Sequence, residues 1–168
     1  MVELLRQQQV MTYFATATGE SDAVKCELAA EVLRSSGALR LQVTGCSMLP
    51  TVWPGDTILI ERVEKCAFSV GDIVLFGRDR RLFLHRVTGR IDASGGPEIL
   101  TRGDAMPRPD SPVPESDLLG KVSYISRNGK LIAPRKIPRW TERVIAALVR
   151  SSDFAARVVV GIRGRCET

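Results

Sequence analysis

Near the start of the chain, apolar residues recur at the spacing of a helix. The apolar positions are Val24, Leu28, Val32 and Leu33. Ser21-Asp22 precedes them as a suitable N-cap, and Gly37 follows them as a suitable end. The pattern predicts a short amphipathic helix that packs on the rest of the domain. Residues 1–20 are polar and weakly patterned.

From Leu39 the apolar positions alternate with polar ones, which is typical of strands with one buried face. Six segments carry this pattern: residues 39–43, 57–63, 72–78, 82–90, 98–103 and 118–126. Glycine and proline residues separate the segments, and no helical pattern lies between them. Asn128-Gly129 follows the last segment and is a strong hairpin-turn signal. The sequence therefore predicts a mainly β fold with an antiparallel core.

A helical pattern returns after Pro134–Pro138, and Ser151-Ser152-Asp153 divides it into two short helices. We therefore expect three parts along the chain. They are an N-terminal segment with a short helix (residues 1–38), a β core (39–133) and a helical tail (134–168).

Composition and charge narrow the function classes. The chain has 168 residues and a net charge of +5, enough for one domain with a sizeable core. Its longest apolar run, Val144–Val149, is far shorter than the ~20 residues of a membrane-spanning helix. No secretory leader pattern is present, so we expect a cytoplasmic protein.

The positive charge is concentrated in the tail, where residues 135–165 hold eight basic side chains against two acidic ones. Aromatic residues make up only 5% of the chain and no nucleic-acid-reading motif is present, so we expect no nucleic-acid partner. Two interpretations of the tail stay open: helices packed on the sheet, or a weak contact with a membrane surface.

The cysteines give no sign of a metal or disulfide framework. Cys26, Cys46, Cys66 and Cys166 are scattered singly, without a paired CxxC spacing. We expect neither a metal nor another cofactor.

Candidate chemistry begins in VTGCSMLPTVWPGD, residues 43–56. Gly45 allows the backbone to bend closely around Ser47, and Pro50 stiffens the turn that follows. This presents the Ser47 hydroxyl on a loop between strands, with backbone N–H groups free to form an oxyanion hole. A serine hydroxyl alone is a poor nucleophile, so a base must lie within hydrogen-bond reach.

Four motifs in order along the chain resemble the signal peptidase I and LexA-like clan of serine peptidases. They are GCSMLPTVWPGD (45–56), GDIVLF (71–76), FLHRV (83–87) and TRGDAMPRPD (101–110). The resemblance covers about residues 41–125. It implies the β core of that clan, Ser47 as the nucleophile, and Met48 and Pro50 as substrate-binding residues.

The residue at the position of the base differs from that in bacterial signal peptidases, which carry a lysine there. Here it is His85, the only histidine, so the chain is more similar to the endoplasmic-reticulum-type and archaeal signal peptidases. Alternation places His85 on the same strand face as Phe83 and Val87. Imidazole is largely neutral near pH 7 and can accept the serine proton directly.

An acidic residue should orient the imidazole, and two candidates lie six residues apart, Asp104 and Asp110. The resemblance favours Asp110, and Asp104 stays open. The oxyanion hole would use the backbone at Ser47, with Cys46 and Thr44 beside it, because Gly45 stands where many signal peptidases have a serine. The Cys46 side chain is interpreted as a small core-facing group.

The resemblance implies a serine endopeptidase that cleaves an extended peptide or precursor protein, with small residues before the scissile bond. The peptide would lie along a sheet edge. Two alternatives stay open: self-processing, as in LexA-like repressors, and a catalytically silent peptide-binding or scaffold module. Self-processing is disfavoured because no Ala-Gly or Cys-Gly bond occurs in the chain.

Overall fold

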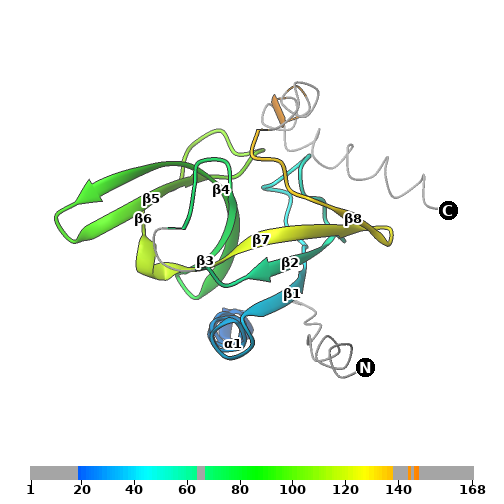
Figure 1. The fold of residues 1–168 in the computed structure, drawn as a ribbon, viewed down its shortest axis with the longest axis horizontal. Helices are drawn as coiled ribbons and strands as arrows, with labels where there is room; N and C mark the ends of the chain where they lie inside the picture. The colour runs from blue at the N-terminus through cyan, green and yellow to red at the C-terminus, as the bar shows by residue number, and fades with distance from the viewer. Residues whose placement is uncertain (1–18, 64–66, 138–143, 145, 148–168) are drawn as a thin grey trace.

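One helix packed on a single antiparallel sheet makes up the described part of the protein (Figure 1). The computed structural model describes residues 19–63, 67–137, 144 and 146–147. Helix α1 (Gly19–Ser36) comes first, and a 3-10 turn (Glu115–Asp117) precedes the seventh strand. The strands are β1 (Ala38–Gln42), β2 (Thr57–Glu61), β3 (Ile73–Arg78), β4 (Arg81–Ala93), β5 (Gly96–Arg102), β6 (Val113–Pro114), β7 (Leu118–Arg127) and β8 (Lys130–Ile132).

The sheet has the order β1-β2-β7-β3-β4-β5-β6, and β8 pairs with β7. The long strand β7 therefore joins two halves of the molecule, because it pairs with both β2 and β3. At Gly120 a β carbon would lie 2.6 Å from the Glu61 carbonyl oxygen. Only glycine allows the backbones of β2 and β7 to approach this closely.

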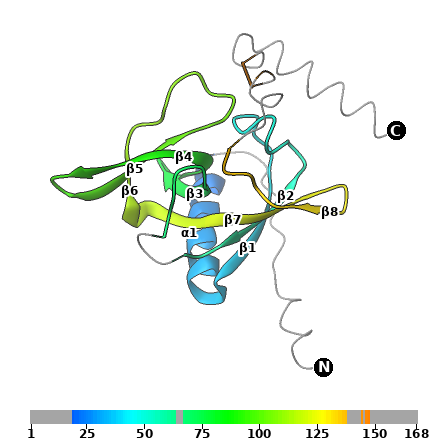
Figure 2. The ribbon, with the colours of Figure 1, turned by 45° about the horizontal axis from the view of Figure 1, so that its top comes forward.

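Both faces of the sheet carry apolar clusters, because alternate residues of β3 point to opposite sides. Ile73 and Leu75 join the cluster beneath α1, which also holds Leu33. Val74 and Phe76 join a second cluster on the other face. Figure 2 shows α1 lying across the sheet beside β1 and β7.

The mainly β prediction is confirmed, and each of the six expected segments overlaps a strand. Alternation did not predict β6, which has two residues. The predicted hairpin turn joins β7 to β8, with positive φ at Asn128 and Gly129. The helix is also confirmed, and it ends at Ser36, just before Gly37, whose φ is +75°. Its predicted N-cap at Ser21-Asp22 is wrong, because α1 already begins at Gly19.

The basic tail falls almost entirely outside the described residues, so its helices and its contact with a membrane surface stay predictions. Within the part of the chain that the structure describes, no helix is long and apolar enough to cross a membrane.

The edges of β1 and of the first half of β4 are among those without a strand partner in the described part of the chain. β1 pairs with β2 alone, so its outer edge is open. In β4, residues 81–85 pair with β3 only, because pairing with β5 begins at Arg86. An open edge offers backbone N–H and C=O groups to an additional strand.

Candidate active site

The loop that carries Ser47, residues 43–56, is anchored in the core by its apolar side chains. Met48, Leu49 and Val52 are buried, whereas Ser47 is half-buried. Backbone hydrogen bonds from Leu49 to Cys46 and from Val52 to Met48 fold the segment into consecutive turns. Buried residues on the C-terminal side of Ser47 thus hold the hydroxyl at the surface of the domain.

An ion pair fastens the base of this nucleophile loop to β7. Arg127 contacts Asp56 through Nη2 at 2.6 Å and also donates to the Thr51 carbonyl at 2.9 Å. Asp56 is buried and accepts the Trp53 backbone N–H at 2.8 Å. The loop is therefore held at two points by one arginine.

His85 lies on β4, opposite Val74 of β3, and its side chain is buried. The imidazole packs against the rings of Phe76 and Phe83, with centroids 6.0 Å away in each case. Phe83 and Val87 belong to the same cluster, so the predicted shared face is confirmed. Aromatic neighbours on this face fix the plane of the imidazole.

The carboxylate behind the imidazole is that of Asp110. His85 Nδ1 lies 2.6 Å from Asp110 Oδ2, and the Thr101 hydroxyl donates to the same oxygen at 2.7 Å. Burial works to raise the pKa of Asp110, but the hydrogen bonds from His85 and Thr101 outweigh it and hold that pKa below its usual value. The carboxylate stays ionised, so Nδ1 carries the proton and Nε2 is the basic nitrogen.

Gly103 marks where Ser47 and the imidazole come together. A β carbon on Gly103 would lie 2.7 Å from the Ser47 carbonyl oxygen and 3.1 Å from His85 Nε2. The Ala105 backbone N–H donates to the same Ser47 oxygen at 2.9 Å. Nε2 therefore faces the nucleophile loop, although within the described residues no hydrogen bond joins it to the Ser47 hydroxyl. Catalytic hydrogen bonds are often long without substrate.

Asp104 has a different environment from Asp110. It forms a two-pronged pair with Arg86, whose Nε and Nη2 lie 2.8 Å and 2.7 Å from the carboxylate oxygens. Thr51 of the nucleophile loop also donates to Asp104. Arg86 Nη1 reaches the carbonyl oxygens of Gly71 and Arg135. The Asp104–Arg86 pair thus ties together the strand of His85, the nucleophile loop and the segment after β8.

The remaining predicted residues are placed as follows. Thr44 and Cys46 are exposed on the Ser47 turn, so the interpretation of the Cys46 side chain as core-facing is wrong. Met48 lines a cavity beside Ser47, although it is almost completely buried. Pro50 is buried and does not line that cavity. The Leu49–Pro50 peptide bond is cis.

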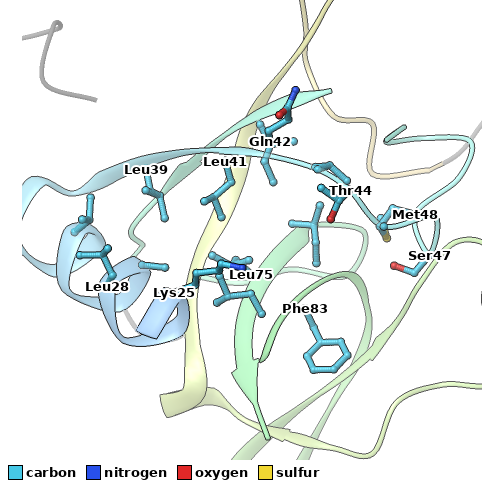
Figure 3. A pocket seen from close by; sticks show the side chains of 17 residues that line it. Lys25, Leu28, Leu39, Leu41, Gln42, Thr44, Ser47, Met48, Leu75 and Phe83 are labelled. Carbon is cyan, nitrogen blue, oxygen red and sulfur yellow. The ribbon is translucent and has the colours of Figure 1, made fainter. Parts of the chain in front are cut away.

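The cavity beside Ser47 has a volume of about 210 Å³ and lies between β1, β4 and α1. Figure 3 shows it from close by, with Ser47 and Met48 at one end and Leu28 of α1 at the other. Leu41 and Thr44 approach from the β1 side, and Phe83 comes from β4. The two open strand edges therefore border the same hollow.

Sequence reasoning missed three contributors to the site. Thr101 and Arg86 act through side-chain hydrogen bonds to the two aspartates. The third is the wall that α1 forms in the cavity. Thr101 and Arg86 lie within the quoted motifs, which could have pointed to them, but the contacts themselves join separate segments of the chain and leave no pattern in the sequence.

The arrangement can perform nucleophilic catalysis by serine, with imidazole as the base. Within the described residues, no group of three or more His, Cys, Asp or Glu side chains is placed to hold a metal ion. A scan against protein-family models and a search of curated proteins found no match to this chain, so the geometry of the site carries the functional argument.

Proposed function

We propose that the protein is a serine endopeptidase with the fold and mechanism of the signal peptidase and LexA-like clan. The single observation that carries the proposal is the His85–Asp110 pair at 2.6 Å, with Nε2 facing the loop of Ser47. An isolated surface histidine would need neither a half-buried carboxylate behind it nor a glycine that keeps space open beside Nε2.

In the acylation step, Ser47 Oγ attacks the carbonyl carbon of the peptide bond while its proton passes to His85 Nε2. The negative charge on Asp110 stabilises the imidazolium that forms. As the C–N bond breaks, His85 returns this proton to the leaving amine. An ester then joins the acyl fragment to Ser47.

The negatively charged oxygen of the tetrahedral intermediate needs hydrogen-bond donors. The turn at Ser47 exposes Thr44, Gly45 and Cys46 beside the nucleophile, and the backbone N–H groups of Ser47 and these neighbours are the nearest candidates. Hydrolysis of the ester follows when water, deprotonated by His85, attacks the same carbon and Ser47 leaves with the proton.

An extended peptide is the substrate that the surroundings favour. The outer edge of β1 and the edge of β4 at residues 81–85 both lack a strand partner in the described part of the chain. Leu41 of β1 and Leu84 of β4 line one cavity with Ser47. A strand added between these edges would pass the nucleophile with its backbone hydrogen-bonded.

The test is labelling with a fluorophosphonate probe followed by mass spectrometry. Ser47 Oγ should displace fluoride from phosphorus as His85 takes the hydroxyl proton, so the wild-type protein gains one adduct on Ser47. Ser47→Ala and His85→Ala should not be labelled. Asp110→Asn should be labelled about 10³–10⁴-fold more slowly, because the imidazole loses its correct tautomer.

Cys46→Ala is the matched control, because this exposed thiol neighbours the nucleophile and its removal should leave labelling unchanged. Circular dichroism establishes that each variant is folded. A folded wild-type protein that the probe does not modify would sink the peptidase proposal and favour a catalytically silent peptide-binding module.

A further inference from the structure

The cavity beside Ser47 is too large and too apolar for the small substrate residues that the resemblance implies. Its volume is about 210 Å³, and its walls are mostly aliphatic. From β4 come Leu82 and Leu84, and from β1 come Leu39 and Leu41. A methyl group placed here would leave most wall atoms without van der Waals partners.

Helix α1 closes the end of the cavity away from Ser47, as Figure 3 shows for Leu28. Ala29 and Val32 of the same helix also line it. Lys25 lies on this wall too, and its ammonium group pairs with Asp22 at 3.2 Å. The helix therefore sets how far a substrate side chain can reach from the nucleophile.

The position of His85 indicates which fragment of the substrate enters the cavity. His85 must protonate the leaving amine, so the leaving fragment lies beside Nε2. The imidazole packs with Phe76 and Phe83. Leu82 and Leu84, on the other face of β4, line the cavity, and Phe83 borders it from the side of His85. The fragment held as the ester on Ser47 thus extends toward α1.

We propose that this cavity is a specificity pocket for a bulky aliphatic or aromatic side chain on the acyl side of the cleaved bond. This inference rests on the proposed peptidase function and names its substrate class. The pocket is continuous with the nucleophile at Ser47 and flanked by the open edges that would hold the peptide backbone. The substrate peptide itself is therefore the occupant.

The test uses acetylated tripeptide aldehydes as competitors of fluorophosphonate labelling. Ser47 Oγ adds to the aldehyde carbon while its proton passes through His85 to the aldehyde oxygen, so every side chain of the inhibitor lies on the acyl side. Each position in turn carries Ala, Leu or Phe. At one position, the Leu or Phe inhibitor should halve labelling at a concentration at least about tenfold lower than the Ala inhibitor does. The reason is that each buried methylene increases the affinity roughly fourfold.

Val32→Phe fills the pocket from its half-buried helix wall, and it should abolish the advantage of Leu and Phe over Ala. Val24→Phe is the matched control, because Val24 is on the same helix, 59% exposed and outside the pocket. It should leave the advantage intact. Fluorophosphonate labelling without competitor should stay normal in Val24→Phe, and the advantage in each variant is measured relative to its own labelling rate without competitor.

Equal competition by the Ala, Leu and Phe inhibitors would overturn the inference, as would an advantage that survives Val32→Phe. Decanoic acid is the probe for a lipid chain. If it blocks labelling in the wild type but not in Val32→Phe, while the peptide side chains have no effect, the pocket belongs to a lipid chain and the inference is overturned.

Failure of the proposed function can be distinguished from failure of the pocket inference, because only the former leaves the wild-type protein unlabelled by the probe. In that case calorimetry measures the affinity of the corresponding peptide alcohols for Ser47→Ala, so the side-chain preference of the pocket is tested without catalysis. Tighter binding of the Leu or Phe peptide that Val32→Phe removes would support the pocket, and equal binding would overturn it.

Discussion

Two aspartates six residues apart in one loop have different partners, and strand geometry decides which. His85 and Arg86 are neighbours on β4, so their side chains leave opposite faces of the strand. Asp110 meets His85 and Thr101 on one face, whereas Asp104 meets Arg86 and the nucleophile loop on the other. One aspartate can serve the chemistry while the other holds the parts in position.

Thr101→Val tests the electrostatic environment of Asp110. Thr101 is completely buried and donates to the carboxylate, so the variant should lose about 1–3 kcal/mol of unfolding free energy at pH 7. Because the folded-state pKa of Asp110 is lowered, the stability that it contributes is present above the ordinary carboxyl pKa of ~3.9. That stability is lost as pH falls through the folded-state pKa.

The difference between the wild type and Thr101→Val should therefore shrink in acid. Urea unfolding at pH 7, 5 and 3 measures it. A difference that stays constant over this range would mean that Thr101 contributes by packing alone.

Gly45→Ser should accelerate the reaction of Ser47. A β carbon at Gly45 would meet no heavy atom within 4 Å, so the turn has room for the side chain. Its hydroxyl would add a donor beside the oxyanion and raise the labelling rate by roughly tenfold, below the effect of a fully aligned donor. Gly45→Ala is the control for the added methylene. Equal rates in the two variants would place the oxyanion elsewhere.

At the scale of elements, the nucleophile loop owes its position to contacts at its base. Arg127 of β7 holds Asp56 and the Thr51 carbonyl, and Met48 and Val52 insert into the cluster beneath α1. These contacts hold the Ser47 hydroxyl in place although Ser47 lies in a turn and not in a strand.

The Asp56–Arg127 pair should contribute strongly to this loop. Arg127→Met leaves a buried carboxylate unpaired and should cost about 3 kcal/mol, at the lower end for buried pairs because Arg127 keeps some contact with solvent. Combined with Asp56→Asn in a double-mutant cycle, it should show a coupling energy above about 1 kcal/mol. Arg102→Met, at an exposed arginine of β5, should be neutral.

Labelling of Ser47 should slow in Arg127→Met even under conditions where the variant stays folded, because the Thr51 carbonyl and Asp56 lose the hydrogen bonds from Arg127. An unchanged labelling rate would show that the core contacts of Met48 and Val52 and the hydrogen bond from Thr51 to Asp104 hold the loop without Arg127.

Alternation and turn residues predict the strands well, because the formation of a strand or a turn depends mainly on residues that are close together in the sequence. The same alternation places His85 correctly beside Phe83 and Val87. It could not choose between Asp104 and Asp110, since the choice depends on how the loop after β5 folds back onto β4. Nor could it predict the pocket wall, because the distance from α1 to β4 follows from packing across the whole sheet.

At the scale of the molecule, the sheet is covered differently on its two faces. Helix α1 covers one apolar cluster and borders the pocket, while the second cluster supports the imidazole. Changes to the helix should therefore alter which peptides are accepted, and changes behind His85 should alter the rate of reaction.

The unpaired side of β1 has a consequence for self-association. Arg40 is exposed and stands at the middle of the five-residue strand, so two copies pairing antiparallel about that point would set Arg40 opposite its own equivalent. Like charges in that position oppose pairing. Arg40→Thr should therefore raise the dimer fraction in sedimentation experiments at high protein concentration, while Arg62→Thr, just beyond β2, should not. A monomeric Arg40→Thr protein would refute this reasoning. An exposed arginine at this position would thus disfavour pairing with a second copy of the chain and leave the edge of β1 available to the proposed peptide substrate.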